Sequence, residues 1–219
     1  MSRRANVGQR CQGCMMHLSL CICALVPRLE TKTRLLLVMH KAEKRKPTNT
    51  GHLAAKALVN SQTVIRGIEG APEPALEWPA DHEPVLLYPA EDAKPLERTS
   101  HPITLIVPDG NWRQAGKVRQ RVRSLRDVRC VTLPPGEPTT YRLRTESVPN
   151  GLATIEAIAR AFGILEGAHV QAALEAIFRT MVERTLWIRG SITTAEVQDG
   201  IPEGVTKHDP QSGTNRREA

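Results

Sequence analysis

The chain has 219 residues, of which 40% are hydrophobic and 3% aromatic, and it carries a net charge of +7. This length suits one globular domain with short attachments, and the basic balance favours a polyanionic partner, with nucleic acid as the leading candidate. No apolar run approaches the roughly 20 residues of a membrane-spanning helix and the N-terminus lacks a secretory signal, so we expect a cytoplasmic protein with no membrane partner.

Near the N-terminus, four of the five cysteines form the pattern C-x2-C-x6-C-x-C: Cys11, Cys14, Cys21 and Cys23. Cytosolic thiols stay reduced, and Zn²⁺ prefers four thiolate or imidazole ligands in a tetrahedron. The spacing therefore predicts a structural zinc site in an N-terminal element, residues 1–32, with His17 as a possible substitute ligand. A redox or incidental cluster is the alternative. The fifth cysteine, Cys130, is expected to be a small buried hydrophobe.

Strand and helix patterns then alternate up to residue 192. Short apolar runs with the length of buried strands occur at 33–40, 62–66, 85–88, 103–107 and 128–133. Helix patterns occur at 52–60, where Thr48, Asn49 or Thr50 could be the cap, and at 112–125, 152–163 and 168–188. This order predicts an α/β domain over 33–192 with a mostly parallel sheet covered on both faces. The acidic stretch 69–97 is expected to be a surface excursion, and 193–219 a polar, disordered tail.

Ligands in such sheets bind outside the carboxyl ends of the strands, so the loops at 41–51, 89–93, 108–112 and 134–144 are candidates for a single site. One of them opens the stretch PDGNWRQAGKVRQRVRSLR, residues 108–126, in which a carboxylate precedes a cationic segment. Either Asp109 or Asn111 caps a helix here, or Asp109 ends a central strand beside a ligand. Trp112 either walls that site or packs in the core.

Three basic segments, KAEKRK, the helix at 112–126 and YRLR, are either solvated faces or binding surfaces for phosphate. The scarcity of aromatic residues favours a folded RNA, recognised by shape and phosphates, over a stacked single strand. Glu156 raises a further choice. It either belongs to the first turn of a helix capped by Thr154, or holds Arg142 or Arg144, or contacts a ligand.

The CxxC and CxC pairs, MHKAEKRKPTNTGHLA, LYPAEDA, PDGNWRQAGK, LPPGEPTTYRLR and LATIEAIA together resemble, in order, the motifs of the DTW-domain family. These proteins are tRNA-uridine aminocarboxypropyltransferases related to the SPOUT class of RNA methyltransferases. The resemblance covers about residues 11–188. The family motif is Asp-x-Thr-Trp, and this chain has Asn111 in the Thr position. Asn is as good a helix cap as Thr, so we expect the loop geometry to be kept.

The resemblance implies a SPOUT-like cofactor-binding domain, with a knotted backbone expected from the superfamily. It also implies transfer of the 3-amino-3-carboxypropyl group of S-adenosylmethionine to N3 of a tRNA uridine. The alternatives are an S-adenosylmethionine-dependent RNA methyltransferase and a non-catalytic zinc-ribbon RNA-binding factor. The protein could act as a monomer or a homodimer.

Within that chemistry we assign Asp109 as the acceptor for the N3–H of the uridine, either as a general base that takes the proton or as an ionised group that accepts the hydrogen bond and orients the base. The residues expected to bind the cofactor are Leu87, Tyr88, Pro89, Asn111, Trp112, Leu133 and Pro134. The residues expected to bind RNA are Lys44, Arg45, Lys46, Asn49, Arg113, Lys117, Arg142 and Arg144.

Overall fold

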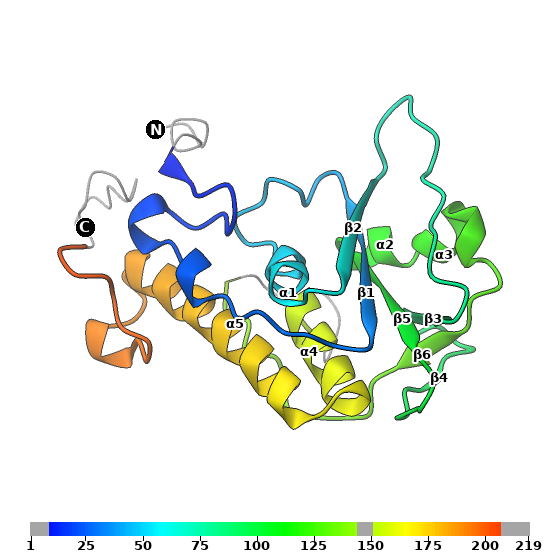
Figure 1. Cartoon of the computed structure of the whole chain (residues 1–219). Coiled ribbons are helices and arrows are strands. Elements are labelled where there is room, and N and C mark those ends of the chain that lie inside the picture. The colour runs from blue at the N-terminus through cyan, green and yellow to red at the C-terminus, as the bar shows by residue number, and fades with distance from the viewer. Residues whose placement is uncertain (1–8, 144–150, 207–219) are drawn as a thin grey trace.

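A computed structural model describes residues 9–143 and 151–206, and its centre is one parallel sheet in the order β2-β1-β5-β3-β6-β4 (Figure 1). The strands are β1 (Arg34–His40), β2 (Ser61–Arg66), β3 (Glu83–Leu87), β4 (Lys94–Pro95), β5 (Ile103–Asp109) and β6 (Cys130–Thr132). The predicted α/β class, parallel sheet and five strands are confirmed. In the sheet β5 lies between β1 and β3, so that the last residue of β5, Asp109, pairs with Met39 near the end of β1.

Both faces of the sheet are buried, as the continuous apolar strands predict. Alternate residues of β1 serve two cores: Leu35 and Leu37 face one, and Leu36 and Val38 the other. The first core packs under the helices α1 (Gly51–Ala57), α4 (Thr154–Leu165) and α5 (Ala168–Ile188). The second packs under α3 (Val118–Arg121) and the 3-10 turn η4 (Arg123–Leu125), on the opposite side of the sheet, where α2 (Trp112–Ala115) also lies (Figure 1).

The single helix expected from 112 to 125 is wrong, because α2, α3 and η4 replace it. The apolar residues at helical spacing in this segment are nevertheless buried, since Val118, Val122 and Leu125 all lie in the second core. The extended backbone of Val122 (φ −89°, ψ 106°) interrupts the helix and lets the chain follow the sheet. At Gly116 a Cβ would lie 2.7 Å from the Tyr88 hydroxyl, so this turn also packs closely against the end of β3.

The stretch 69–97 is more integrated than a surface excursion. Besides β3 it contains the short edge strand β4, which was not expected, and Leu76 is buried in the second core. Arg66, only 2% exposed, forms an ion pair of 3.3 Å with Glu73. Its Nη1 also donates to the carbonyl of Gln114, so one buried guanidinium ties this stretch to α2.

Two end segments are built onto α5. The N-terminal element, with turns η2 (Leu18–Leu20) and η3 (Cys23–Leu25), buries Met16, Leu20 and Ile22 in the first core. Residues 193–206, expected to start a disordered tail, instead contain the turn η5 (Thr194–Glu196) and pack on the helix. Trp187 Nε1 donates to Thr194 Oγ1 at 3.0 Å. Residues 207–219 lie outside the described residues. Among those described, no helix is long and apolar enough to cross a membrane.

Candidate functional site

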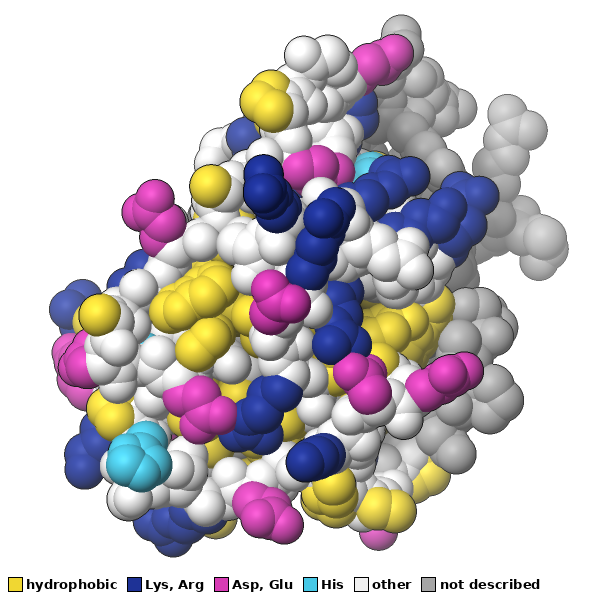
Figure 2. All heavy atoms as spheres, turned by 90° about the vertical axis from the view of Figure 1, so that its right-hand side faces the viewer, with side chains coloured by type: hydrophobic (Ala, Val, Ile, Leu, Met, Phe, Trp, Pro, Cys, Tyr) yellow, Lys and Arg dark blue, Asp and Glu magenta, His cyan; other side chains and the backbone are white. Residues whose placement is uncertain are grey.

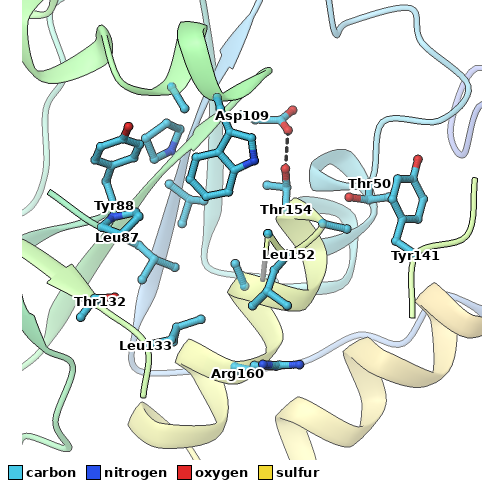
Figure 3. Close-up of a pocket in the computed structure, with 18 of the residues that line it drawn as sticks. Thr50, Leu87, Tyr88, Asp109, Thr132, Leu133, Tyr141, Leu152, Thr154 and Arg160 are labelled. Carbon is cyan, nitrogen blue, oxygen red and sulfur yellow. Dashed lines mark hydrogen bonds between the residues drawn. The ribbon is translucent and has the colours of Figure 1, made fainter. Parts of the chain in front are cut away.

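A cavity of about 690 Å³ lies at the carboxyl ends of β3, β5 and β6, beside the start of α4 (Figure 3). The four loops predicted to form a single site all contribute to its lining. They meet because parallel strands end at one edge of the sheet and β5 lies between its neighbours. The volume falls in the range of small-molecule sites, which is about 300–1,000 Å³.

The residues expected to bind a cofactor surround this cavity. All seven line it: Leu87, Tyr88, Pro89, Asn111, Trp112, Leu133 and Pro134. Pro89, Asn111 and Pro134 are exposed at its rim. The rings of Tyr88 and Trp112 lie 6.3 Å apart at a tilt of 52°, so they form one aromatic wall. The cavity therefore combines an apolar interior with an open, partly polar mouth.

Asp109 is the buried acid of the cavity, and 4% of it is exposed. Asn49 Nδ2 donates to its Oδ2 at 2.5 Å. Thr154 Oγ1 donates to its Oδ1 at 2.8 Å, as Figure 3 shows. A Cβ at Gly51 would lie only 3.0 Å from the carboxyl carbon, so the glycine lets the start of α1 approach the acid. Hydrogen bonds of this kind stabilise the ionised carboxylate.

The choice between Asp109 and Asn111 as the helix cap is decided in favour of Asn111. Its Oδ1 accepts from the backbone N–H of Gln114 at 2.9 Å, and Gln114 Oε1 accepts from the N–H of Asn111 at 2.9 Å. This reciprocal capping box holds the loop between β5 and α2. Asn in the Thr position of the family motif therefore keeps a capping geometry, as expected, and Asp109 faces the cavity.

Thr154 has a different role from the predicted cap, because its hydroxyl is used by Asp109. The N-cap of α4 is Ala153, whose N–H donates to Glu156 Oε2 at 2.8 Å. The carboxylate of Glu156 also accepts from the N–H of Thr140 at 2.8 Å. Glu156 thus belongs to the first turn and fastens the neighbouring loop. Arg142 is exposed, and Arg144 lies outside the described residues.

The predictions from the sequence assigned no role at the site to Arg160 or Tyr141, although both line the cavity. Arg160 Nη2 donates to the carbonyl of Glu137 at 2.5 Å, and the Tyr141 hydroxyl donates to the carbonyl of Thr48. Tyr141 stands in YRLR and Arg160 lies in a regular helix. Neither sequence setting marks its residue as part of a site. Their position at the cavity depends on the packing of α4 and of the loop before it.

The residues expected to bind RNA divide into two groups. Lys44, Arg45, Lys46, Arg113, Lys117 and Arg142 are exposed. Asn49 is instead buried and bonded to Asp109, which argues against direct RNA contact. On the side of the molecule that carries α3 and β4, Lys and Arg side chains are interspersed with Asp and Glu (Figure 2). Arg119, for example, pairs with Asp92 at 2.7 Å, so part of this positive charge is neutralised locally.

The four cysteines of the N-terminal element converge, and all four Sγ atoms lie within 4.8 Å of one another. The Sγ atoms of Cys11 and Cys23 are 3.5 Å apart, and those of Cys14 and Cys21 are 3.7 Å apart. A tetrahedral site with Zn–S bonds of about 2.3 Å has S···S edges of about 3.8 Å, so the cluster fits a zinc ion. His17 is not part of it, because its ring contacts Ser19 and Gln9.

The thiols of the cluster differ in acidity. Burial raises the pKa of Cys11, but hydrogen bonds from the backbone N–H groups of Cys14 and Gly13 and from the thiols of Cys23 and Cys21 outweigh this and lower it to about 6. Burial and the hydrogen bond to Cys11 raise the pKa of Cys23 to about 12. A bound cation would stabilise the thiolate form of all four cysteines together. Cys130, outside the cluster, is buried as expected, and burial raises its pKa.

Known proteins are similar to this chain over most of its length. The family model of the DTW domain matches residues 8–186. The chain is 27% identical over 173 residues to tRNA-uridine aminocarboxypropyltransferase 2 of Drosophila melanogaster, a match covering 74% of this chain and 68% of the relative. It is 28% identical over 167 residues to the protein of the same name from Macaca fascicularis, covering 71% of this chain and 56% of that relative. The chain thus spans little more than half of the macaque protein. No solved structure matches it.

Proposed function

The chain belongs to the DTW-domain family, and from this membership we propose that it is a tRNA-uridine aminocarboxypropyltransferase. It would move the 3-amino-3-carboxypropyl group of S-adenosylmethionine to N3 of a tRNA uridine. The observation that carries the proposal is the single arrangement of Asp109, buried and hydrogen-bonded, in an apolar cavity at the carboxyl ends of parallel strands. The names of the Drosophila and macaque relatives support the same chemistry.

The donor is proposed to lie in the cavity, with its adenosine and methionine parts against Leu87, Leu133 and the Tyr88–Trp112 wall. Such apolar and aromatic surfaces bind the uncharged parts of a ligand, and a few polar groups orient it. Methyl and aminocarboxypropyl groups leave the same sulfonium, so the group transferred depends on how the cavity turns the donor.

Trp112→Ala is expected to weaken S-adenosylmethionine binding by about tenfold or more, because a large apolar contact is lost. Calorimetry on the purified protein measures this directly. Trp78→Ala is the matched control, since Trp78 packs in the second core and is absent from the cavity lining. Equal affinity in the wild type and a folded Trp112→Ala variant would place this side chain outside the donor site.

The proposed reaction uses Asp109 to hold and accept a proton. Its carboxylate accepts a hydrogen bond from the uridine N3–H while Asn49 and Thr154 keep it oriented. The donor supplies an electrophilic carbon bonded to a positive sulfur. As N3 bonds to that carbon, the carbon–sulfur bond breaks with its electron pair passing to sulfur, 5′-methylthioadenosine leaves, and the N3 proton passes to Asp109.

The exposed cations Arg113 and Lys117 are proposed to hold tRNA phosphates beside the cavity mouth. Replacing both by Gln is expected to lower the slope of log binding constant against log salt by about one per lost contact. Filter binding at several salt concentrations measures the slope. Arg119→Gln is the control, because Arg119 is already engaged by Asp92. A slope unchanged by the double substitution would contradict this assignment. We extend the RNA-binding proposal to Lys44, Arg45, Lys46 and Arg142, and to Arg144, which lies outside the described residues.

Three further proposals accompany this function. The cysteine cluster is proposed to hold a structural Zn²⁺, supported by its S···S distances. A SPOUT-like domain is supported by the parallel sheet and by the cavity at its carboxyl edge. The cytoplasm is proposed as the compartment, since a four-thiolate site requires reducing surroundings. Metal analysis of the purified protein tests the zinc proposal, and an experimental structure tests the SPOUT-like domain. Localisation of the tagged protein tests the compartment.

The function is tested by incubating the purified protein with S-adenosylmethionine and tRNA lacking the modification, followed by mass spectrometry of the nucleosides. A uridine heavier by one aminocarboxypropyl group is expected. A methyl-sized increment would replace the proposal with an RNA methyltransferase. Intact tRNA binding without any increment would instead identify a non-catalytic zinc-ribbon RNA-binding factor.

A further inference from the structure

Hydrogen bonds at the start of α1 link the cysteine cluster to Asp109, the candidate catalytic acid. His52, at the start of α1, lies between them, with Nε2 3.2 Å from the carbonyl oxygen of Cys14. Since a carbonyl oxygen only accepts, this ring nitrogen donates. In the neutral ring Nδ1 then carries no proton, so its 3.1 Å contact with the acceptor Asn49 Oδ1 is not a hydrogen bond. The hydrogen bond to Asn49 comes instead from the backbone N–H of His52. His52 therefore contacts one residue of the cluster and one residue of the cavity.

The orientation of the Asn49 amide follows from the same loop. The backbone N–H of His52 donates to Asn49 Oδ1 at 3.2 Å, so the oxygen of the amide must face His52. Its nitrogen then faces Asp109 and donates to Oδ2 at 2.5 Å. A flipped amide would place its oxygen against the carboxylate and lose both hydrogen bonds.

We infer that His52 is a positioning residue that links the cysteine cluster to Asp109, by tying the Cys14 carbonyl to the Asn49 amide. The inference rests on the proposed function for the role of Asp109 and on the proposed metal for the order of the cluster. A metal bound to Cys14 holds the backbone of the C-x2-C turn, and that turn holds the ring of His52. The N-terminal element thereby supports the geometry of the transfer step as well as the fold.

A contact with the same carboxylate outside this path provides a control. Thr154 comes from α4, and its hydroxyl donates to Oδ1 of Asp109. None of its described hydrogen bonds involves His52, Asn49 or a cysteine. A change at Thr154 therefore disturbs the carboxylate without interrupting the link to the cluster.

The test uses the full-length, zinc-loaded protein carrying His52→Leu, Asn49→Ala or both. Leu keeps the backbone N–H that bonds to Asn49 but has no donor for the Cys14 carbonyl. Each single variant is expected to lower the single-turnover transfer rate about tenfold, with the S-adenosylmethionine Kd changed less than about twofold. The double variant should be no slower than the slower single one, because both changes break the same link. Additive losses in the double variant would overturn the inference.

A second measurement does not depend on catalysis. Coupling between two sites is reciprocal in binding free energy, so Asn49→Ala should weaken zinc binding, measured by competition with a chromogenic chelator, by about fivefold, although Asn49 is not a zinc ligand. Thr154→Val should leave the zinc affinity unchanged. Equal zinc affinity in the wild type and Asn49→Ala, or a wild type that binds no metal, would overturn the link. If the wild type binds zinc but transfers nothing, the proposed function fails while this comparison still decides the inference.

His52→Asn covers the case in which His52→Leu does not fold. Asn keeps a polar side chain but is too short to reach the Cys14 carbonyl. We expect the same loss of rate and the same weaker zinc binding from this variant. A folded His52→Asn protein with wild-type values for both would also overturn the inference.

Discussion

Replacing Asp109 by Asn is expected to lower the single-turnover rate of uridine modification by about 10²-fold or more, because a positioned general base contributes about 10²–10⁴-fold. Asn has nearly the same shape but cannot take the N3 proton. It also presents an amide to Asn49 and Thr154, both of which donate to the native carboxylate. Mass spectrometry of nucleosides over a time course measures the rate.

Binding of S-adenosylmethionine to the Asp109→Asn variant, measured by calorimetry, should be retained, since the apolar walls of the cavity are unchanged. Asp127→Asn is the matched control, because it removes one negative charge from an exposed position. That control should react at the wild-type rate. An Asp109→Asn protein that binds tRNA and donor and reacts as fast as the wild type would refute a catalytic role for this carboxylate.

Removing the proposed zinc ion is expected to lower the free energy of unfolding by about 3 kcal/mol or more, since structural zinc binding is coupled to folding. Cys14→Ser is the sharpest substitution, because Cys14 is buried and belongs to the same core as Met16, Leu20 and Ile22. Loss of the ion would release these side chains from α5. Thermal unfolding with and without a strong chelator, together with metal content, measures the effect.

The matched control for the zinc prediction is Cys130→Ala, which removes a buried thiol that is outside the cluster. It should retain one zinc ion per chain, and its unfolding should still respond to the chelator. Cys14→Ser should lose both properties. A wild-type protein that contains no zinc and whose melting temperature does not change with chelator would reject the metal site.

The stretch from β5 to α2 shows how much of the site local sequence patterns can predict. The pattern around residues 103–112 predicts a buried strand that ends at an acid, followed by a capped turn, and both are present. The same pattern suits Asp109 and Asn111 as caps, since both have short polar side chains. Only the backbone path after β5 decides between them, by placing Asn111 one residue before α2 and Asp109 in the sheet.

The broken helix between 112 and 125 has a related cause. Periodicity places Val118, Val122 and Leu125 on one face, and all three are buried. Periodicity does not show that the chain must bend to keep them on a twisted sheet. The buried stripe was therefore predicted, whereas the extended residue Val122 was not.

The sequence by itself determined five of the six strands, the long helices α4 and α5, the cysteine cluster and the loops around the cavity. Each depends on neighbours in the chain: apolar runs, helical spacing, or cysteines close enough to wrap one ion. Tertiary structure decided the partners of the buried polar groups. Asn49, Asp109 and Thr154 come from three separate segments, and their hydrogen bonds form only because the crossovers of the parallel sheet bring those segments to one edge.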